Sequence, residues 1–117
     1  MKNQYFGDEN DYRKYGLLRV LTNRGSLGTG ICWMLTDSDG RNDGGRINYL
    51  TKPLKWQGYD PDLYDALVRI VGVDRCRDVA RADDPAILEG MIFQSSQIGH
   101  NCCERQQYFQ ETMQRFK

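Results

Sequence analysis

Histidine is almost absent from this sequence of 117 residues, because His100 is the only one. Histidine is a frequent general base and the commonest metal ligand, so a chain with one histidine has few ways to build a catalytic triad or a zinc site. Cys102 and Cys103 follow His100 closely, but no third group can be placed beside them, and H-x-C-C lacks the C-x-x-C spacing of structural zinc sites. We therefore expect no catalytic residue, metal or cofactor.

An excess of charge of either sign is also missing, since sixteen basic residues balance sixteen acidic ones. Proteins that bind nucleic acid or membrane surfaces non-specifically rely on excess positive charge, so we do not expect a nucleic-acid partner. No apolar run is long enough to cross a bilayer, and the first ten residues lack the apolar core of a signal peptide. The four cysteines, two of them adjacent, indicate reduced thiols. Together these features predict a cytoplasmic protein without a membrane partner.

The remaining composition is that of a globular protein, with 39% hydrophobic and 27% charged residues. The length fits a single domain, residues 1–117. Apolar patterning and capping signals predict helices at 11–24, 61–71, from 85 onwards and at 100–117, and strands at 29–36, 46–50 and 91–96. Residues 77–82 fit either a strand or a helical turn. This order predicts an α/β fold with a small mixed sheet and about four helices.

Two details of the helices can be stated at the level of residues. In the first helix, an apolar stripe is expected to face the core, made of Leu17, Leu18, Val20 and Leu21. The pairs Asp60-Pro61 and Asp84-Pro85 are typical helix starts, because aspartate caps a helix and proline suits its first turn.

The stretch QYFGDENDYRKYGLLRVL, residues 4–21, is dense in groups that bind ligands. A glycine before a helix N-terminus favours anion binding, and tyrosines three residues apart lie on one side of a helix, where they can stack on a base or sugar. The alternative is a hydrophobic staple with a charged outer face. The candidate ligand contacts here are Tyr5, Gly7, Asp8, Asp11, Tyr12, Lys14 and Tyr15.

A second candidate region begins with the first predicted strand and continues into the loop DSDGRNDGG, residues 37–45. In open α/β sheets, ligands bind beyond the carboxyl ends of strands. Carboxylates there could bind ribose hydroxyls, and an arginine could bind a phosphate. A calcium loop is excluded, because its fifth and twelfth positions are Arg41 and Asn48; a pair of solvated Asp-Gly turns is the other interpretation. The candidates are Trp33, Asp37, Asp39, Arg41 and Asp43.

Three segments together, QYFGDENDYRKYGLLRVL, CWMLTDSDGRNDGGRINYL and YDPDLYDAL, resemble a family of bacterial and phage-encoded proteins that has no settled activity. The resemblance covers most of the chain and is strongest over residues 3–67. Longer members of that family look like Rossmann-fold methyltransferases, which implies that this chain is similar to a partial Rossmann-like unit, their N-terminal half. The Asp-Pro catalytic strand of those longer members has no counterpart here, and the loop after residue 36 has no clean G-x-G run.

We therefore expect a non-catalytic, homo-oligomeric binding protein that sequesters a nucleotide or another phosphorylated small molecule, such as a host defence signalling nucleotide if the chain is phage-encoded. One alternative is a relative or fragment of an S-adenosylmethionine-dependent nucleic-acid methyltransferase, in which the basic segments 24–30 and 52–56 would contact phosphates. Another is an interaction module that docks through the last helix, with Phe109, Met113 and Phe116 exposed.

Overall fold

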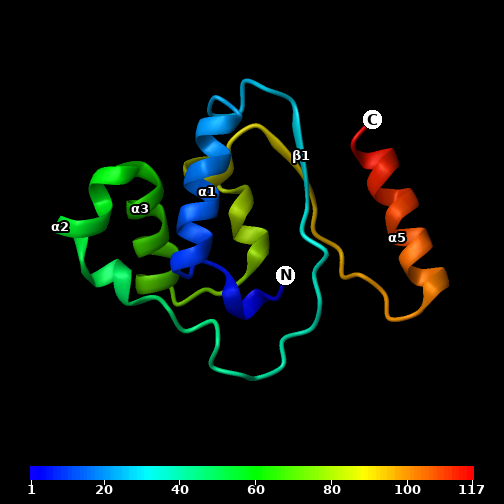
Figure 1. Ribbon diagram of the computed structural model, residues 1–117, viewed down its shortest axis with the longest axis horizontal. Coiled ribbons are helices and arrows are strands. Elements are labelled where there is room, and N and C mark those ends of the chain that lie inside the picture. The colour runs from blue at the N-terminus through cyan, green and yellow to red at the C-terminus, as the bar shows by residue number, and fades with distance from the viewer.

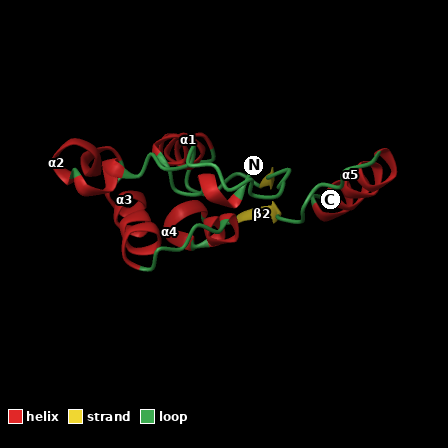
Figure 2. Cartoon of the chain, turned by 90° about the horizontal axis from the view of Figure 1, so that it is seen from below, coloured by secondary structure: helices red, strands yellow, loops and turns green.

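A computed structural model describes residues 1–117 and contains five helices and two strands. The elements follow the order α1 (Glu9–Leu21), β1 (Thr29–Cys32), α2 (Pro53–Trp56), α3 (Pro61–Leu67), α4 (Pro85–Leu88), β2 (Met91–Gln94) and α5 (Cys102–Arg115). Figure 1 shows the two strands between a group of four helices and α5, which stands by itself on the other side. The molecule is flat, with extents of 48 × 37 × 19 Å, and Figure 2 shows it edge-on, with the thin direction vertical.

The sheet contains only β1 and β2, which run parallel with Thr29 opposite Met91 and Cys32 opposite Gln94. Parallel strands need a long crossover connection, and here residues 33–90 supply it. The prediction of an α/β fold is confirmed at this coarse level, but the mixed sheet is wrong. Strand β1 is also shorter than the predicted 29–36, although Leu35 adds an isolated parallel bridge to Gln97.

The predicted strand at 46–50 is wrong, because Asn48–Thr51 forms a 3-10 helix. The reason lies in Tyr49, whose side chain is buried among Tyr12, Trp56 and Tyr64. Its hydroxyl donates a hydrogen bond of 2.9 Å to the carbonyl of Gly7. Packing with distant aromatic residues therefore overrides the strand preference of Ile47 and Tyr49.

The capping predictions for the later helices are confirmed. Asp60 accepts a hydrogen bond from the Leu63 amide, and Asp84 accepts one from the Ala86 amide. After α3 the chain continues through a π-helical turn, Val68–Val73. Leu63, Leu67, Ile70 and Val71 are all buried. Residues 79–83 form a 3-10 helix, which resolves the choice between strand and turn.

Helix α1 begins at Glu9 and is capped by Asp8, but its buried face is not the predicted one. Leu17, Val20 and Leu21 are 59%, 77% and 62% exposed. The helix instead buries Tyr12, Tyr15 and Arg19, which share one face because they are spaced by three and four residues. The prediction of an aliphatic inner stripe is therefore wrong for the three exposed residues and holds only for Leu18, which is partly buried against the core; tyrosines and an arginine form the buried face.

Helix α5 packs on the opposite face of the strands from the core. Its buried residues are Tyr108 and Thr112, and neither belongs to the cluster of sixteen residues that forms the core. The Tyr108 hydroxyl lies 3.1 Å from the Cys32 sulfur and accepts a hydrogen bond from the Met34 amide. Phe109, on the same helix, is 64% exposed.

Candidate functional site

Most of the candidate residues in the opening stretch belong to a buried hydrogen-bond cluster centred on Asp11. We call it the Asp11 cluster, and its members are Gly7, Asp8, Asp11, Lys14 and Tyr15. Asp11 is 1% exposed and accepts hydrogen bonds from the Gly7 amide at 3.1 Å, the Lys14 ammonium at 2.7 Å and the Tyr15 hydroxyl at 2.8 Å. Its own amide donates to the capping carboxylate of Asp8. These groups are satisfied inside the protein, so the cluster holds α1 in place.

Burial explains the titration behaviour of this cluster. The Tyr15 hydroxyl is buried next to the Asp11 carboxylate, and both effects raise its pKa far above the ordinary tyrosine value. Burial also raises the pKa of Asp8, with a further contribution from the nearby Asp11 charge. Gly7 has a φ of +71°, and a Cβ there would lie 2.5 Å from a methyl carbon of Val71, so the position requires glycine.

The candidates in the loop after β1 bind the N-terminal segment of the chain. Asp39 forms an ion pair with Lys2 and accepts a hydrogen bond from the Gln4 side chain. These hydrogen bonds lower the pKa of the Asp39 carboxyl well below its usual value. Asp43 accepts hydrogen bonds from Gln4 and from the Tyr5 hydroxyl. The acidic loop therefore fastens the N-terminus, and Arg41, whose side chain is 76% exposed, lies 3.8 Å from the Asp39 carboxylate.

The remaining candidates are spread over the molecule. Trp33 is buried, packs edge-on against Tyr15 with ring centres 6.1 Å apart and stacks on Phe93. Asp37 is exposed, accepts a hydrogen bond from Gln97 and lies 3.7 Å from His100. The structure thus brings Tyr15 and Trp33 together in the core and leaves Asp37 and Arg41 apart from both.

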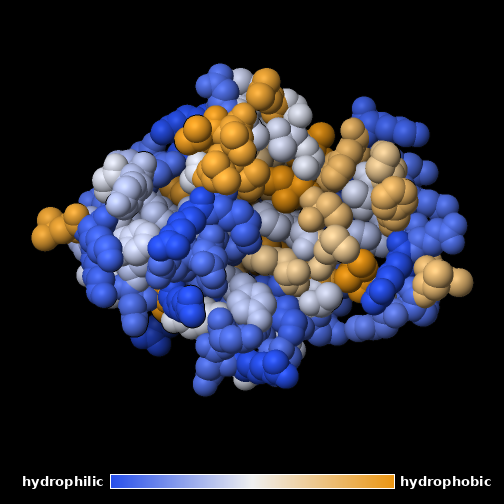
Figure 3. Space-filling model, viewed as in Figure 1, coloured by the Kyte–Doolittle hydropathy of each residue, from blue (hydrophilic) through white to orange (hydrophobic).

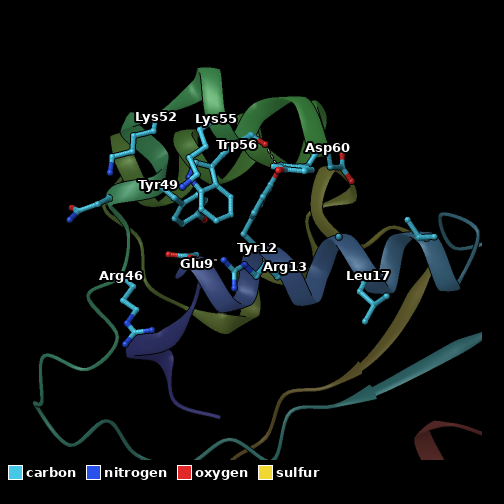
Figure 4. Close-up of a pocket in the computed structure, with 14 residues that line it drawn as sticks. Glu9, Tyr12, Arg13, Leu17, Arg46, Tyr49, Lys52, Lys55, Trp56 and Asp60 are labelled. Carbon is cyan, nitrogen blue, oxygen red and sulfur yellow. Dashed lines mark hydrogen bonds and ion pairs between the residues drawn. The ribbon is translucent and has the colours of Figure 1, made fainter.

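The main cavity lies between α1 and residues 46–60, and its volume is about 760 Å³. Figure 4 shows α1 as its floor, with α2 and the 3-10 helix before it as the opposite wall. No residue between Trp33 and Gly45 lines it, so the cavity does not lie at the carboxyl end of β1. Aromatic and basic side chains dominate the lining, whose main members are Arg13, Arg46, Tyr49, Lys52, Lys55, Trp56 and Tyr59, together with Tyr12 on the floor.

Trp56 contacts several of the other residues that line this cavity. The Arg13 guanidinium lies 5.3 Å from the centre of its indole ring, and the Lys55 ammonium lies 5.4 Å from it, so each makes a cation–π contact. The Trp56 carbonyl accepts a hydrogen bond of 2.8 Å from the Tyr12 hydroxyl, which reaches up from α1 (Figure 4). Tyr12 therefore fixes the position of α2 over α1, and Trp56 is held at the border of the cavity.

The cavity has an excess of free positive charge, because both of its acidic side chains are already paired with arginines. Asp60 binds the buried Arg19 guanidinium at 2.7 Å, and Glu9 binds Arg13. No carboxylate lies within ion-pair distance of Arg46, Lys52 or Lys55. All three are exposed, so the cavity has uncompensated positive charge beside aromatic rings.

Of the twelve predicted ligand contacts, only Tyr12 lines this cavity. Sequence reasoning missed Arg46, Tyr49, Lys55 and Trp56 as members of one site. A usable signal was present in KPLKW, residues 52–56, which combines two lysines and a tryptophan within five residues. Those bases were predicted to contact phosphates only under the methyltransferase alternative.

Comparisons with known proteins give no relative: no protein-family model, no curated protein and no solved structure matches this chain. The resemblance to the bacterial and phage-encoded family stays an expectation from the sequence. Three further observations concern the chain itself. No group of three or more His, Cys, Asp or Glu side chains is placed to hold a metal ion. All four cysteines are free, and none of the helices is long and apolar enough to traverse a bilayer.

Proposed function

We propose that this protein binds a nucleotide, or another phosphorylated small molecule with an aromatic group, in the cavity between α1 and residues 46–60. One observation carries the proposal: Arg46, Lys52 and Lys55 have no acidic partner and surround the same cavity as the indole of Trp56. Cations without partners attract an anionic ligand, and the half-buried indole of Trp56 with the exposed ring of Tyr59 offers aromatic surface for a base.

The lining suggests how the two parts of such a ligand divide the cavity. Arg46 and Lys52 both lie at the end of the cavity near the N-terminus of α1, with their side chains extending in different directions (Figure 4). Each can donate charge-assisted hydrogen bonds to an anionic group that enters at this end, and the arginine could bind a phosphate through two nitrogens. The base would then reach Trp56 and Tyr59, where the lining is aromatic. A volume of about 760 Å³ lies within the range of small-molecule sites.

Binding without catalysis is the role that this chemistry supports. General acid–base catalysis needs a titratable group free to exchange a proton with the substrate. The cavity has no histidine or cysteine, its two acids are held in ion pairs with Arg13 and Arg19, and its unpaired titratable groups are the basic residues and tyrosines that would contact the ligand. Sequestration of the ligand therefore fits better than its conversion. The proposal rests on this cavity and not on a Rossmann-like strand end, where a methyltransferase would hold its cofactor.

Isothermal titration calorimetry with ATP, ADP and AMP tests this function. We expect saturable binding of at least one of them, and affinity that falls with added salt because the contacts are ionic. The double variant Arg46→Gln/Lys52→Gln should weaken binding about tenfold or more, since each lost charged hydrogen bond is worth about 1.5–3 kcal/mol. Trp56→Ala should weaken it by about 1–3 kcal/mol through lost stacking.

Arg81→Gln is the matched control, because Arg81 is exposed and does not line the cavity. It removes one positive charge from the protein and should leave affinity unchanged. Equal losses in Arg81→Gln and in Lys52→Gln would mean that net charge, and not the cavity, attracts the ligand. The absence of binding by all three nucleotides at millimolar concentration would contradict the proposal for nucleotides.

A further inference from the structure

The outer edge of β1 is unpaired over most of its length. The Trp33 amide donates to the Gln94 carbonyl, and the Ile98 amide donates to the Leu35 carbonyl, so odd-numbered residues of this strand face β2. Backbone groups alternate in direction along a strand. The amides and carbonyls of Gly30 and Cys32 therefore point away from β2, toward an edge where no other strand lies.

The same edge binds an extended segment immediately beyond β1. The Met1 amino group donates to the Met34 carbonyl at 3.2 Å, and the Thr36 amide donates to the Met1 carbonyl at 2.8 Å. Met1 thus covers the edge beside residues 34–36. Residues 29–33 stay open, and they contain no proline and no charged residue. Proline and charged residues are the usual means by which edge strands avoid pairing, so nothing in residues 29–33 opposes pairing with another strand.

Apolar surface borders this open edge on α1. A groove of about 510 Å³ runs between the strand and the helix, and its lining includes Leu18 and Ile31 together with one charged residue, Lys14. Leu21 follows Leu18 on the same side of α1 and is 62% exposed, and Leu27 in the next turn is 57% exposed. Figure 3 shows hydrophobic surface over the C-terminal half of α1 and, on the same broad face, across the strand region toward α5.

The molecule exposes more surface than a compact monomer of its mass, and the difference is about the area that one partner buries in a standard interface. It amounts to 7438 Å², whereas a compact monomer of 13.6 kDa exposes about 6,600 Å². The excess of roughly 840 Å² is close to the share of about 800 Å² that each partner contributes to a standard interface. An isolated pair of strands is also only marginally stable, so a larger sheet would stabilise the fold.

We propose that this face binds a second copy of the chain, with β1 pairing antiparallel to β1 of that copy across a two-fold axis at Ile31. Gly30 then lies opposite Cys32 of the second copy, and the two residues exchange both of their backbone hydrogen bonds. The same axis repeats this pair, so the two sheets join into one of four strands. A two-fold axis needs a self-complementary surface, and an uncharged strand flanked by apolar side chains provides one.

Sedimentation velocity at protein concentrations from about 1 to 100 µM tests the proposal. Interfaces of this size have Kd values of micromolar or lower. The wild-type protein should sediment as a dimer with twice the 13.6 kDa chain mass. Leu21→Lys should raise the dimer Kd about tenfold or more, because it places a charge in the interface. Leu54→Lys is the control, since Leu54 is fully exposed on α2, on the far side of α1 from β1 (Figure 1).

Amide hydrogen exchange identifies the pairing strand. In the dimer, the Gly30 and Cys32 amides should exchange slowly, and in Leu21→Lys at low concentration they should exchange quickly. A wild-type monomer at all concentrations would overturn the proposal. So would a dimer in which these two amides exchange as fast as in Leu21→Lys, or equal dissociation in Leu54→Lys and Leu21→Lys.

Discussion

The Asp11 cluster and the cavity above α1 are built from the same kinds of side chain, yet they differ in one respect. In the Asp11 cluster, the carboxylate of Asp11 is buried and accepts hydrogen bonds from three donors of its own chain. In the cavity, Arg46 and Lys52 are exposed and have no acidic partner. Tyrosines next to charges therefore do not by themselves indicate a binding site. A structural cluster differs from a binding site in that its polar groups already have hydrogen-bond or ionic partners within the protein.

The largest effect on stability should come from removing the centre of the Asp11 cluster. Asp11→Ala leaves the buried Gly7 amide and Tyr15 hydroxyl without an acceptor, and each such loss costs about 1–3 kcal/mol. We expect the free energy of unfolding in urea to fall by about 2–4 kcal/mol. Asp62→Ala is the control, because that carboxylate is 71% exposed and should change stability by less than about 0.5 kcal/mol. Similar values for the two variants would contradict the account.

A smaller loss is expected from Tyr15→Phe, which removes one donor and leaves Asp11 with two. The expected decrease in unfolding free energy is about 1–2 kcal/mol. Tyr59→Phe makes the same chemical change on a residue that is 78% exposed in the cavity wall and should have no measurable effect. If Tyr59→Phe were the more destabilising variant in thermal and urea unfolding, the assignment of the two regions would be reversed.

The pH dependence of stability should report on Asp8. Burial raises the pKa of Asp8 in the folded state, so the folded protein holds this proton more tightly than the unfolded chain does. The resulting cost is absent below the unfolded pKa of about 3.9 and develops as pH rises through the folded pKa. Asp8→Asn keeps an oxygen for the helix cap and removes this titration.

We therefore expect Asp8→Asn to gain stability relative to wild type at neutral pH, and this gain should shrink as the pH falls to about 4. Urea unfolding of both proteins at several pH values measures the difference. A gain that does not depend on pH, or a loss that grows toward neutral pH, would contradict the proposed burial effect.

The smallest effect on stability is expected in the cavity. Arg46→Gln/Lys52→Gln should change the free energy of unfolding by less than about 0.5 kcal/mol, because neither cation has an ionic partner to lose. The same variant should weaken nucleotide binding, so stability and affinity respond to different regions. A strongly destabilised double variant would show that these cations support the fold, and would remove the reason for placing a ligand there.

The sequence allowed parts of the fold to be predicted because their signals are local. The Asp-Pro starts at residues 60 and 84 act within one helical turn, and both were correct. The prediction of the buried face of α1 was wrong because hydropathy ranks leucine above tyrosine and arginine. Arg19 is buried because Asp60, 41 residues away, pairs with it at 2.7 Å. Such a long-range ion pair cannot be recognised from hydropathy.

The site was harder to predict than the fold because it joins two segments that are distant in sequence. Tyr12 on α1 and Trp56 on α2 meet through a hydrogen bond across 44 residues. The sequence predicts a strand over residues 46–50, and a strand there would place Tyr49 in a sheet, away from Tyr12. The observed 3-10 conformation instead brings the basic side chains of residues 46–55 over α1.

The two tryptophans allow the central comparison to be tested in one experiment. Trp33 lies in the core, and its indole nitrogen is buried without a hydrogen-bond partner, whereas Trp56 borders the cavity. We would record ¹H–¹⁵N correlation spectra of the protein during a titration with ATP and assign the two indole signals with Trp56→Phe. The account predicts a saturable shift of the Trp56 signal while the Trp33 signal stays in place. A stationary Trp56 signal at millimolar ATP, or a shift confined to Trp33, would contradict it.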